Sequence, residues 1–296
     1  MKKVLAVILI LVVLAIVLIY SLIPARILIV NIAFVKSNAS AVQRTVSRND
    51  LWDKWGHGQF TVDKRLSNGV SVNSSYKGTG LPGQIIIISL RDDSSAIRWE
   101  TSLPVATGPL QRFSSYMHAR SLKEKMTVAL QYFKNFCDKD SNVYGLHIQQ
   151  RSTRDTFLVA TKFSTRNYPS LSIIYDNINK LRKFAVENNA AETSSPMLNI
   201  TKEDSSHYNC MVAVPVNQQV TNKGDIFFVR MVPGRFLVTE LKGGPLTISQ
   251  AHQTMRQYFQ DYKRTSMAIP FEYLVTDRQF DKDTANWVTR LYYPVY

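Results

Sequence analysis

The strongest pattern in the sequence is an unbroken apolar run near its start. Residues 4–23 contain no charged side chain, and Lys2 and Lys3 come directly before them. A run of about 20 apolar residues is long enough for a helix to cross the hydrocarbon core of a bilayer. We therefore expect residues 1–24 to be a membrane anchor, with a transmembrane helix over residues 4–23.

The charges that flank this helix predict its orientation. Lys2, Lys3 and the terminal amine outweigh Arg26 on the other side, which favours a cytoplasmic N-terminus and an extracytoplasmic, periplasmic-side location for the rest of the chain. A cleaved signal peptide is the alternative. Its apolar region would be shorter, however, and residues 21–26 offer no small-x-small cleavage signal. We expect an uncleaved signal anchor and a single-pass membrane protein.

Residues 25–138 show the pattern of one strand, a short helix, several strands and a long final helix. A buried-strand run covers residues 25–34 and a helical pattern covers 39–55, while Ser121 and Glu124 stand at capping-box spacing before the final helix. Strand patterns cover residues 60–66, 70–76, 84–90, 97–103 and 110–118. We expect a curved antiparallel sheet wrapped on the final helix, followed by a polar linker over residues 139–145.

The C-terminal half, residues 146–296, contains a strand-helix-strand-strand pattern twice. The matching strands, each pair 79 residues apart, are 157–159 with 236–238 and 212–216 with 291–295. Pro196 and Pro270 match at a spacing of 74 residues, so the loop lengths differ. A repeat of this length indicates a duplicated half-domain, because solenoid repeats are about 20–50 residues long. We expect repeats over about 146–217 and 224–296, with a central groove between them.

The second repeat has the clearer pattern. Residues 235–241 are typical of a strand, and Thr247 with Gln250 forms a capping-box pattern at the start of a helix over residues 247–262. Two runs rich in β-branched and aromatic residues, 269–277 and 287–295, then predict a hairpin.

Composition narrows the classes of partner. The chain has 296 residues, 45% of them hydrophobic, with a net charge of +14 and two cysteines. It contains no helix-turn-helix or zinc-finger spacing and no long run of basic residues, so we expect no nucleic acid partner. The five histidines lack metal-ligand spacing, and the G-x-G-x-x-G match at residues 78–83 leads into a strand instead of a helix. We expect neither a metal nor a cofactor.

A family resemblance can be stated for each half. The order of elements in residues 25–138, with Trp52 and Trp55 forming W-x-x-W, resembles the START-like, polyketide-cyclase (SRPBCC) superfamily. The first helix lacks the family's usual proline. This resemblance implies an α+β helix-grip fold.

Residues 146–296 resemble the GyrI-like small-molecule-binding domain, which is also the effector-binding module of AraC-type and MerR-type regulators. The motifs that carry the resemblance are Pro233-Gly234-Arg235-Phe236, Gly243, Pro270-Phe271-Glu272-Tyr273, Asp277 and the closing strand 289–295. A membrane helix, a START-like domain and this module form a recognisable bacterial arrangement. The resemblance implies an α+β fold and a hydrophobic or amphiphilic small molecule as the partner.

Aromatic side chains and a carboxylate are the predicted ligand contacts. The aromatic candidates are Tyr168, Phe236, Tyr273, Trp287, Tyr292 and Tyr293. Glu272 is the family's acid, while Arg290 stands where the family's closing strand has a second acid. If Arg290 faces the groove, the groove favours neutral or anionic amphiphiles; if it faces solvent, this preference has no basis.

Three function classes stay open at this point. The leading hypothesis is a membrane-anchored, non-catalytic protein that binds or senses a small molecule. A hydrolase that uses Glu272 as general base is one alternative, because burial raises the pKa of a carboxylate. A regulatory role toward a signalling or transcription protein is the other.

Overall fold

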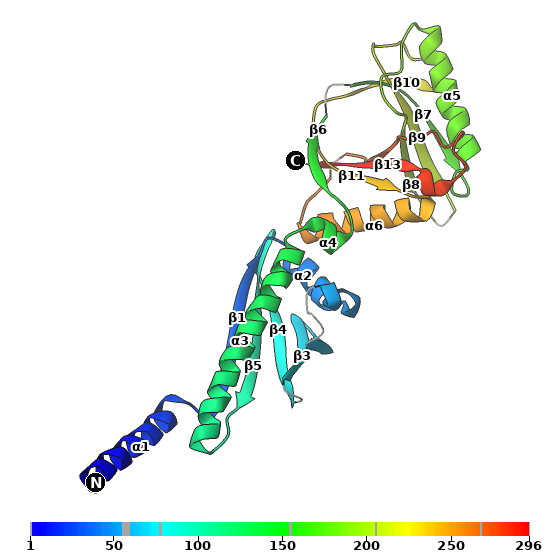
Figure 1. Ribbon diagram of the computed structural model, residues 1–296. Helices are drawn as coiled ribbons and strands as arrows, with labels where there is room; N and C mark the ends of the chain where they lie inside the picture. The colour runs from blue at the N-terminus through cyan, green and yellow to red at the C-terminus, as the bar shows by residue number, and fades with distance from the viewer. Residues whose placement is uncertain are drawn as a thin grey trace. The chain divides into compact units, whose positions relative to one another are not determined.

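The computed structural model describes residues 2–54, 60–76, 79–153, 156–204, 206–266 and 268–295. The chain divides into two compact units, Met1–Val143 and Tyr144–Tyr296, here called the N-terminal and C-terminal units. It is a mixed α+β protein with one apolar N-terminal helix and two antiparallel sheets (Figure 1). Trp55 of the W-x-x-W pattern, His57 and Gly78 lie outside the described residues.

The apolar run forms helix α1 (Lys2–Leu22). Among the described residues, it is the one helix long and apolar enough to cross a membrane. Its most apolar part, within Lys3–Leu22, has a mean hydropathy of 3.3, and none of that part is buried in the protein. A signal sequence has the same properties, so membrane anchoring and its orientation stay predictions.

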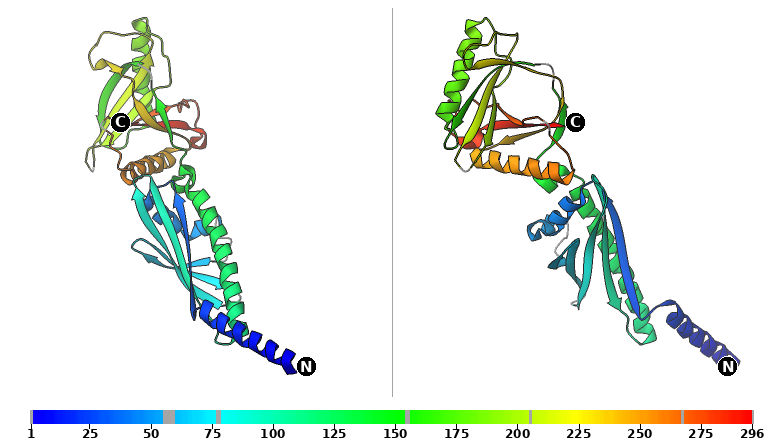
Figure 2. Two further views of the ribbon diagram at one scale, coloured as in Figure 1. Left: turned by 90° about the vertical axis from the view of Figure 1, so that its left-hand side faces the viewer. Right: turned by 180° about the vertical axis from the view of Figure 1, so that it is seen from behind.

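The N-terminal unit is a five-stranded antiparallel sheet with helices packed on one face (Figure 2). Its elements are β1 (Arg26–Val35), α2 (Ala39–Val46), the 3-10 helix η1 (Asn49–Lys54), β2 (Phe60–Leu66), β3 (Gly69–Tyr76), β4 (Thr79–Arg91), β5 (Ser94–Pro104) and α3 (Pro109–Cys137). The strand order is β1-β5-β4-β3-β2. The core between the sheet and α3 contains the fully buried Trp99, Met126 and Phe133.

Three sequence predictions for this unit were wrong. Residues 110–118 are the start of α3 and not a strand, because Pro109 opens the helix and the apolar residues after it recur at helical spacing. Ser121 and Glu124 therefore lie inside α3 and do not cap it. The predicted helix over 39–55 is interrupted after Val46. A short helix, α4 (Asp140–Tyr144), lies within the predicted linker.

The C-terminal unit is an eight-stranded antiparallel sheet curled into a half-barrel (Figure 1). Its elements are β6 (Gln149–Ser152), β7 (Thr156–Thr165), α5 (Leu171–Glu187), β8 (Met197–Lys202), β9 (Tyr208–Val216), β10 (Ile226–Met231), β11 (Arg235–Lys242), α6 (Pro245–Asp261), β12 (Phe271–Leu274), the 3-10 helix η2 (Thr284–Asn286) and β13 (Val288–Val295). The strand order is β10-β7-β9-β8-β12-β13-β11-β6.

This order contains the predicted duplication. The repeats are β7-α5-β8-β9 and β11-α6-β12-β13, and in each one the last strand pairs with the other two strands. The predicted hairpin is the pair β12 and β13. The two repeats of the C-terminal unit meet where β8 lies beside β12, and we call this boundary the seam. Two residue pairs join the strands there, Glu272 with Leu198 and Tyr273 with Met197.

The two faces of this sheet differ. On the helix face, α5 and α6 cover alternate strand residues, among them Val159, Leu198 and Leu291. The intervening residues lie on the open face, where Phe236, Phe271 and their neighbours form a separate apolar cluster. The predicted cap of α6 was wrong, since Gly244 and Pro245 start the helix and Thr247 lies inside it.

Candidate ligand-binding site

A cavity of about 610 Å³ lies on the helix face of the seam. Its walls come from both repeats: β8 and the Tyr168 and Tyr208 rings from the first, and α6, β12 and β13 from the second. The lining residues are Tyr168, Leu198, Asn199, Ile200, Thr201, Lys202, Tyr208, Pro245, Leu246, Ile248, Ser249, His252, Arg256, Pro270, Phe271, Glu272 and Tyr293. We call this space the seam cavity. Its volume is within the range of about 300–1,000 Å³ that small-molecule sites occupy.

A chain of three polar side chains forms one wall. Nε2 of His252 lies 3.0 Å from Oε1 of Glu272, and Nδ1 of His252 lies 2.7 Å from the hydroxyl of Tyr293. With Glu272 ionised, the Nε2–H group donates to the carboxylate and Nδ1 accepts from the Tyr293 hydroxyl. Both ring nitrogens of His252 are therefore occupied within the protein.

Behind this wall, Arg278 supplies the positive charge that faces Glu272. Its Nη2 lies 3.8 Å from Oε2 of Glu272 and donates to Thr289 Oγ1 at 2.8 Å. The guanidinium stacks over the Trp287 ring at 4.9 Å. Glu272 and Arg278 are both nearly inaccessible, with 5% and 7% of their surfaces exposed. The buried carboxylate is thus compensated inside the protein.

At the positions that the structure describes, the polar wall is found in the second repeat and has no counterpart in the first. Helices α5 and α6 have the same length and start 74 residues apart, so the position of His252 corresponds to Ile178. The same spacing relates Glu272 to Leu198, which is its own partner across the seam. Ile178 and Leu198 are apolar and buried. The duplicated fold therefore has one polar site, at His252 and Glu272, and one apolar counterpart, at Ile178 and Leu198. Because the apolar pair occupies the corresponding positions, the fold does not require the hydrogen bond between His252 and Glu272.

Positive side chains lie on the cavity side. Lys202 of β8 and Arg256 of α6 both line the cavity. Burial raises the pKa of the Tyr293 hydroxyl to about 12, the Glu272 charge acts in the same direction, and Arg256 acts in the opposite one. Since Glu272 already faces Arg278, the accessible charge of the cavity is positive.

The raised pKa of Tyr293 gives a pH-dependent contribution to stability. Its folded-state pKa of about 12 exceeds the unfolded value of about 10, so the contribution is complete below pH 10 and is lost as the pH rises through 12. Between pH 9 and 11 the wild-type unit should lose about 1.3 kcal/mol more unfolding free energy than Tyr293→Phe. Denaturant titrations of both proteins at the two pH values measure this difference; equal losses would contradict it.

The structure distributes the sequence-predicted site residues over both faces. Glu272 and Tyr168 line the seam cavity. Phe236 lines a smaller apolar cavity of about 390 Å³ on the open face. Tyr273 and Tyr292 pack beside it, with Tyr292 stacked on Phe271 at 5.2 Å between ring centroids.

Trp287 and Arg290 line neither cavity. The Trp287 ring is buried under Arg278 and donates through Nε1 to the carbonyl of Asp281. Arg290 lies on the open face and forms a 2.6 Å ion pair with Glu240 on the neighbouring strand. Alternation along β13 turns the Arg290 side chain away from Glu272. Arg290 therefore gives no reason to expect a preference for neutral or anionic amphiphiles.

Sequence reasoning missed His252, Arg256 and Arg278. His252 follows Ile248 by one helical turn and so borders the predicted buried face of α6, which was the available signal. Arg278 lies in a loop, where no periodic pattern predicts burial.

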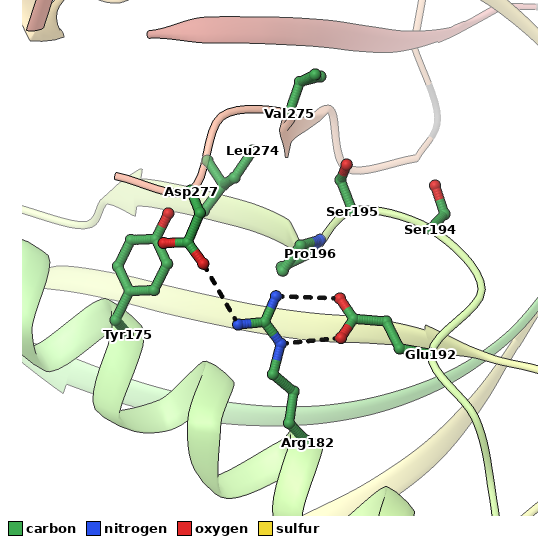
Figure 3. A pocket seen from close by; sticks show the side chains of 9 residues that line it. All are labelled: Tyr175, Arg182, Glu192, Ser194, Ser195, Pro196, Leu274, Val275 and Asp277. Carbon is green, nitrogen blue, oxygen red and sulfur yellow. Dashed lines mark hydrogen bonds and ion pairs between the residues drawn. The ribbon is translucent and has the colours of Figure 1, made fainter. Parts of the chain in front are cut away.

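Two other polar clusters in this unit are internally satisfied. A hollow of about 400 Å³ beside α5 contains Arg182, which binds both oxygens of Glu192 at 2.9 and 3.2 Å and lies 3.7 Å from Asp277 (Figure 3). Its charges are thus already compensated.

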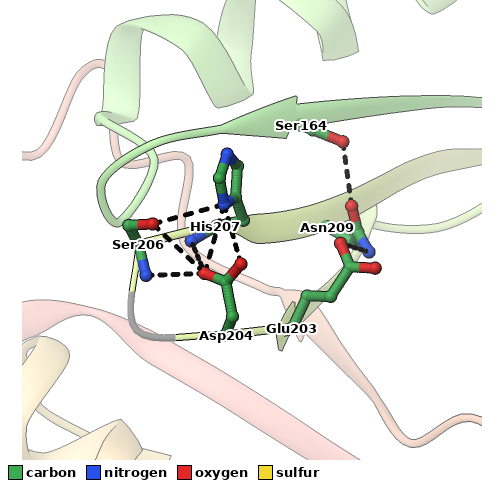
Figure 4. A network of polar contacts seen from close by, with 6 residues as sticks. All are labelled: Ser164, Glu203, Asp204, Ser206, His207 and Asn209. Carbon is green, nitrogen blue, oxygen red and sulfur yellow. Dashed lines mark hydrogen bonds and ion pairs between the residues drawn. The ribbon is translucent and has the colours of Figure 1, made fainter.

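The second cluster is the exposed turn around His207 (Figure 4). The Asp204 carboxylate accepts from the backbone N–H groups of Ser206 and His207, which lowers the pKa of Asp204 to about 2. Asp204 and Ser206 both contact Nδ1 of His207. A nucleophilic triad needs its serine and its carboxylate on opposite ring nitrogens, so this turn is not one. Within the described parts of the chain, no group of His, Cys, Asp and Glu could hold a metal.

Comparison with known proteins finds distant structural likeness. No protein-family model matches the sequence, and no curated protein sequence matches it. EcmrR in a complex with DNA is similar over 63% of this chain and 70% of that one, at 14% identity and a TM-score of 0.46. The EcmrR C-terminal domain is similar over 51% and 98%, at 16% identity and 0.42. SAV2435 bound to tetraphenylphosphonium is similar over 51% and 94%, at 18% identity and 0.34. At this distance the likeness concerns the general fold alone.

Proposed function

We propose that this chain is a membrane-anchored small-molecule-binding protein whose ligand occupies the seam cavity. In this proposal α1 is the anchor, the N-terminal unit is a START-like domain, and the C-terminal unit is a GyrI-like ligand-binding domain. The GyrI-like assignment is supported by the motif around Pro270 and Glu272 and by the duplicated topology. A protein that senses the ligand for a regulatory partner would use the same cavity.

The ligand class follows from charge compensation around Glu272. Arg278 and His252 already satisfy this carboxylate from inside the protein. Arg256 and Lys202 remain as the charged groups that line the cavity beside the aromatic and aliphatic walls. This arrangement suits an amphiphile with an apolar body and an anionic or neutral polar head.

The same geometry favours binding over hydrolysis. A general base must have a free atom within hydrogen-bonding reach of the substrate or its water. His252 has both ring nitrogens engaged, and Glu272 is shared between His252 and Arg278. We therefore propose that the polar wall maintains the shape and charge of the cavity and does not carry out a reaction.

Arg256→Ala should weaken binding of an anionic amphiphile by about 10- to 150-fold, since a hydrogen bond to a charged group contributes about 1.5–3 kcal/mol. Calorimetry on the full chain in lipid nanodiscs, with empty nanodiscs subtracted, provides the measurement. 2-Naphthalenesulfonate and (2-naphthylmethyl)trimethylammonium are suitable probes because they share one apolar body and differ in charge.

Arg290→Ala is the matched control, because it removes an arginine that lines neither cavity. It should leave binding of the sulfonate unchanged. Tighter binding of the ammonium probe, or equal effects of the two arginine variants, would contradict the proposed ligand class. If the wild-type chain hydrolyses an ester probe and Glu272→Gln abolishes this hydrolysis, the hydrolase alternative would be established instead.

A further inference from the structure

The start of α3 is bonded to the end of α1. Nε and Nη2 of Arg112 donate to the Ile23 carbonyl at 2.8 and 2.6 Å. The Arg112 guanidinium lies 4.7 Å from the centroid of the Tyr20 ring, and the Tyr20 hydroxyl donates to the Thr107 carbonyl. These contacts fix the first turn of α3 at the level where the apolar helix ends.

From that point α3 runs along β1 and away from α1. Asn31 in the middle of β1 donates to the Lys123 carbonyl of α3. Beyond the far end of β1, the backbone N–H of Lys36 donates to Asp138, just past the last residue of α3. The first two turns of α3 are therefore its part nearest to α1.

Those two turns carry an exposed apolar surface. Leu110, Phe113, Tyr116 and Met117 are 83%, 52%, 44% and 46% exposed, and we call them the interfacial patch. They lie on one side of the helix, opposite the core side that begins at Ala119. Aromatic and aliphatic side chains grouped in this way mark a surface that another apolar phase covers.

We propose that the interfacial patch inserts into the headgroup layer of the bilayer that α1 crosses. The inference rests on the membrane anchor of the proposed function. The end of a transmembrane helix lies at the water-lipid boundary, and Arg112 holds the patch at that level. Phe and Tyr side chains suit this layer, and the neighbouring Arg26 and Arg120 suit its anionic headgroups. The N-terminal unit is thus held to the membrane at two places.

The test uses the full chain in vesicles of phosphatidylcholine and phosphatidylglycerol. Val128 is the matched position, because it lies on the same side of α3 as Leu110, 18 residues and about 27 Å farther along, and is 54% exposed. Phe113→Cys and Val128→Cys are prepared separately, and each introduced thiol is labelled with a polarity-sensitive fluorophore. The native Cys137 and Cys210 are buried, and burial raises the pKa of both thiols, so they stay unlabelled.

Spin-labelled lipid should quench the fluorophore at position 113 several-fold more than the fluorophore at position 128. Hydroxyl-radical footprinting gives a second measurement on the unmutated chain: the bilayer should protect Met117 and Tyr116, while Tyr132 reacts as it does in detergent. Equal quenching and no protection, in vesicles that retain the protein on flotation, would overturn the inference. Failure to float would instead refute the membrane anchor itself, and with it the site of insertion.

Discussion

Glu272→Ala is expected to destabilise the C-terminal unit by about 3–5 kcal/mol, because it leaves the buried Arg278 guanidinium without its carboxylate. Within the described residues, Nε of Arg278 has no hydrogen-bond partner. Its guanidinium donates to the Thr289 hydroxyl and forms an ion pair with Glu272. The substitution also removes the acceptor of the His252 Nε2–H group. A free energy of this size is a large part of the total stability of a domain.

The chain provides its own probe for this measurement. Each unit contains one buried cysteine, Cys137 in the N-terminal and Cys210 in the C-terminal unit. Labelling of Cys210 as a function of urea concentration reports unfolding of the C-terminal unit, and labelling of Cys137 serves as the internal reference. The variant should shift the Cys210 transition to lower urea and leave the Cys137 transition unchanged.

Two further variants identify the cause. Glu240→Ala breaks the exposed ion pair with Arg290 and should cost at most about 1 kcal/mol. Arg278→Met combined with Glu272→Ala should recover part of the lost stability, because the double change removes both buried charges. Equal costs for Glu272→Ala and Glu240→Ala would show that Glu272 is not held by a buried ion pair.

Gly69→Ala should destabilise the N-terminal unit by about 3–5 kcal/mol. A Cβ atom at residue 69 would lie 1.9 Å from the carbonyl oxygen of Ile85. That oxygen belongs to β4, which is paired on its other side with β5 at Trp99 and cannot withdraw without breaking the sheet. Urea-dependent labelling of Cys137 measures the loss, and Cys210 is the reference.

Gly80→Ala is the control on the same pair of strands. Its Cβ atom would meet the Asn73 side-chain oxygen at 3.1 Å, and that side chain can rotate away. We expect a cost within about 0.5 kcal/mol, as for most surface substitutions. If the two glycine variants lower the Cys137 transition equally, close approach of the backbones at Gly69 is not the cause.

The duplicated topology was predictable because burial leaves a periodic signal. The matching apolar runs around Phe157 and Phe236 identified both first strands, and the aromatic runs after Pro270 and Trp287 identified the hairpin. Strands without that signal were missed. β6 is polar and exposed along its whole length, and β10 is a partly exposed edge strand.

The face on which a strand residue lies was not predictable. Glu272 and Arg290 belong to paired strands, and a shift of one residue in either strand would move that strand's side chain to the opposite face. The structure fixes Leu291 as the partner of Glu272, so Arg290 lies on the opposite face. The partner of Glu272 on α6 and the loop arginine behind it required tertiary contacts between distant segments, which no local pattern of the sequence encodes.

The seam has a consequence for the order in which the C-terminal unit opens. The seam divides the sheet into two halves, β10-β7-β9-β8 and β12-β13-β11-β6, and two residue pairs join β8 to β12 there, whereas the ladders β7–β9 and β11–β13 are longer. Sub-global opening follows the weakest boundary, so the two halves of the sheet should separate along the seam before either half unfolds. The amide of Leu274, which donates to the Pro196 carbonyl across this boundary, should then exchange its hydrogen earlier than amides inside the β7–β9 ladder. A ligand in the seam cavity would contact both sides of the seam and would therefore stabilise the closed state and slow this exchange.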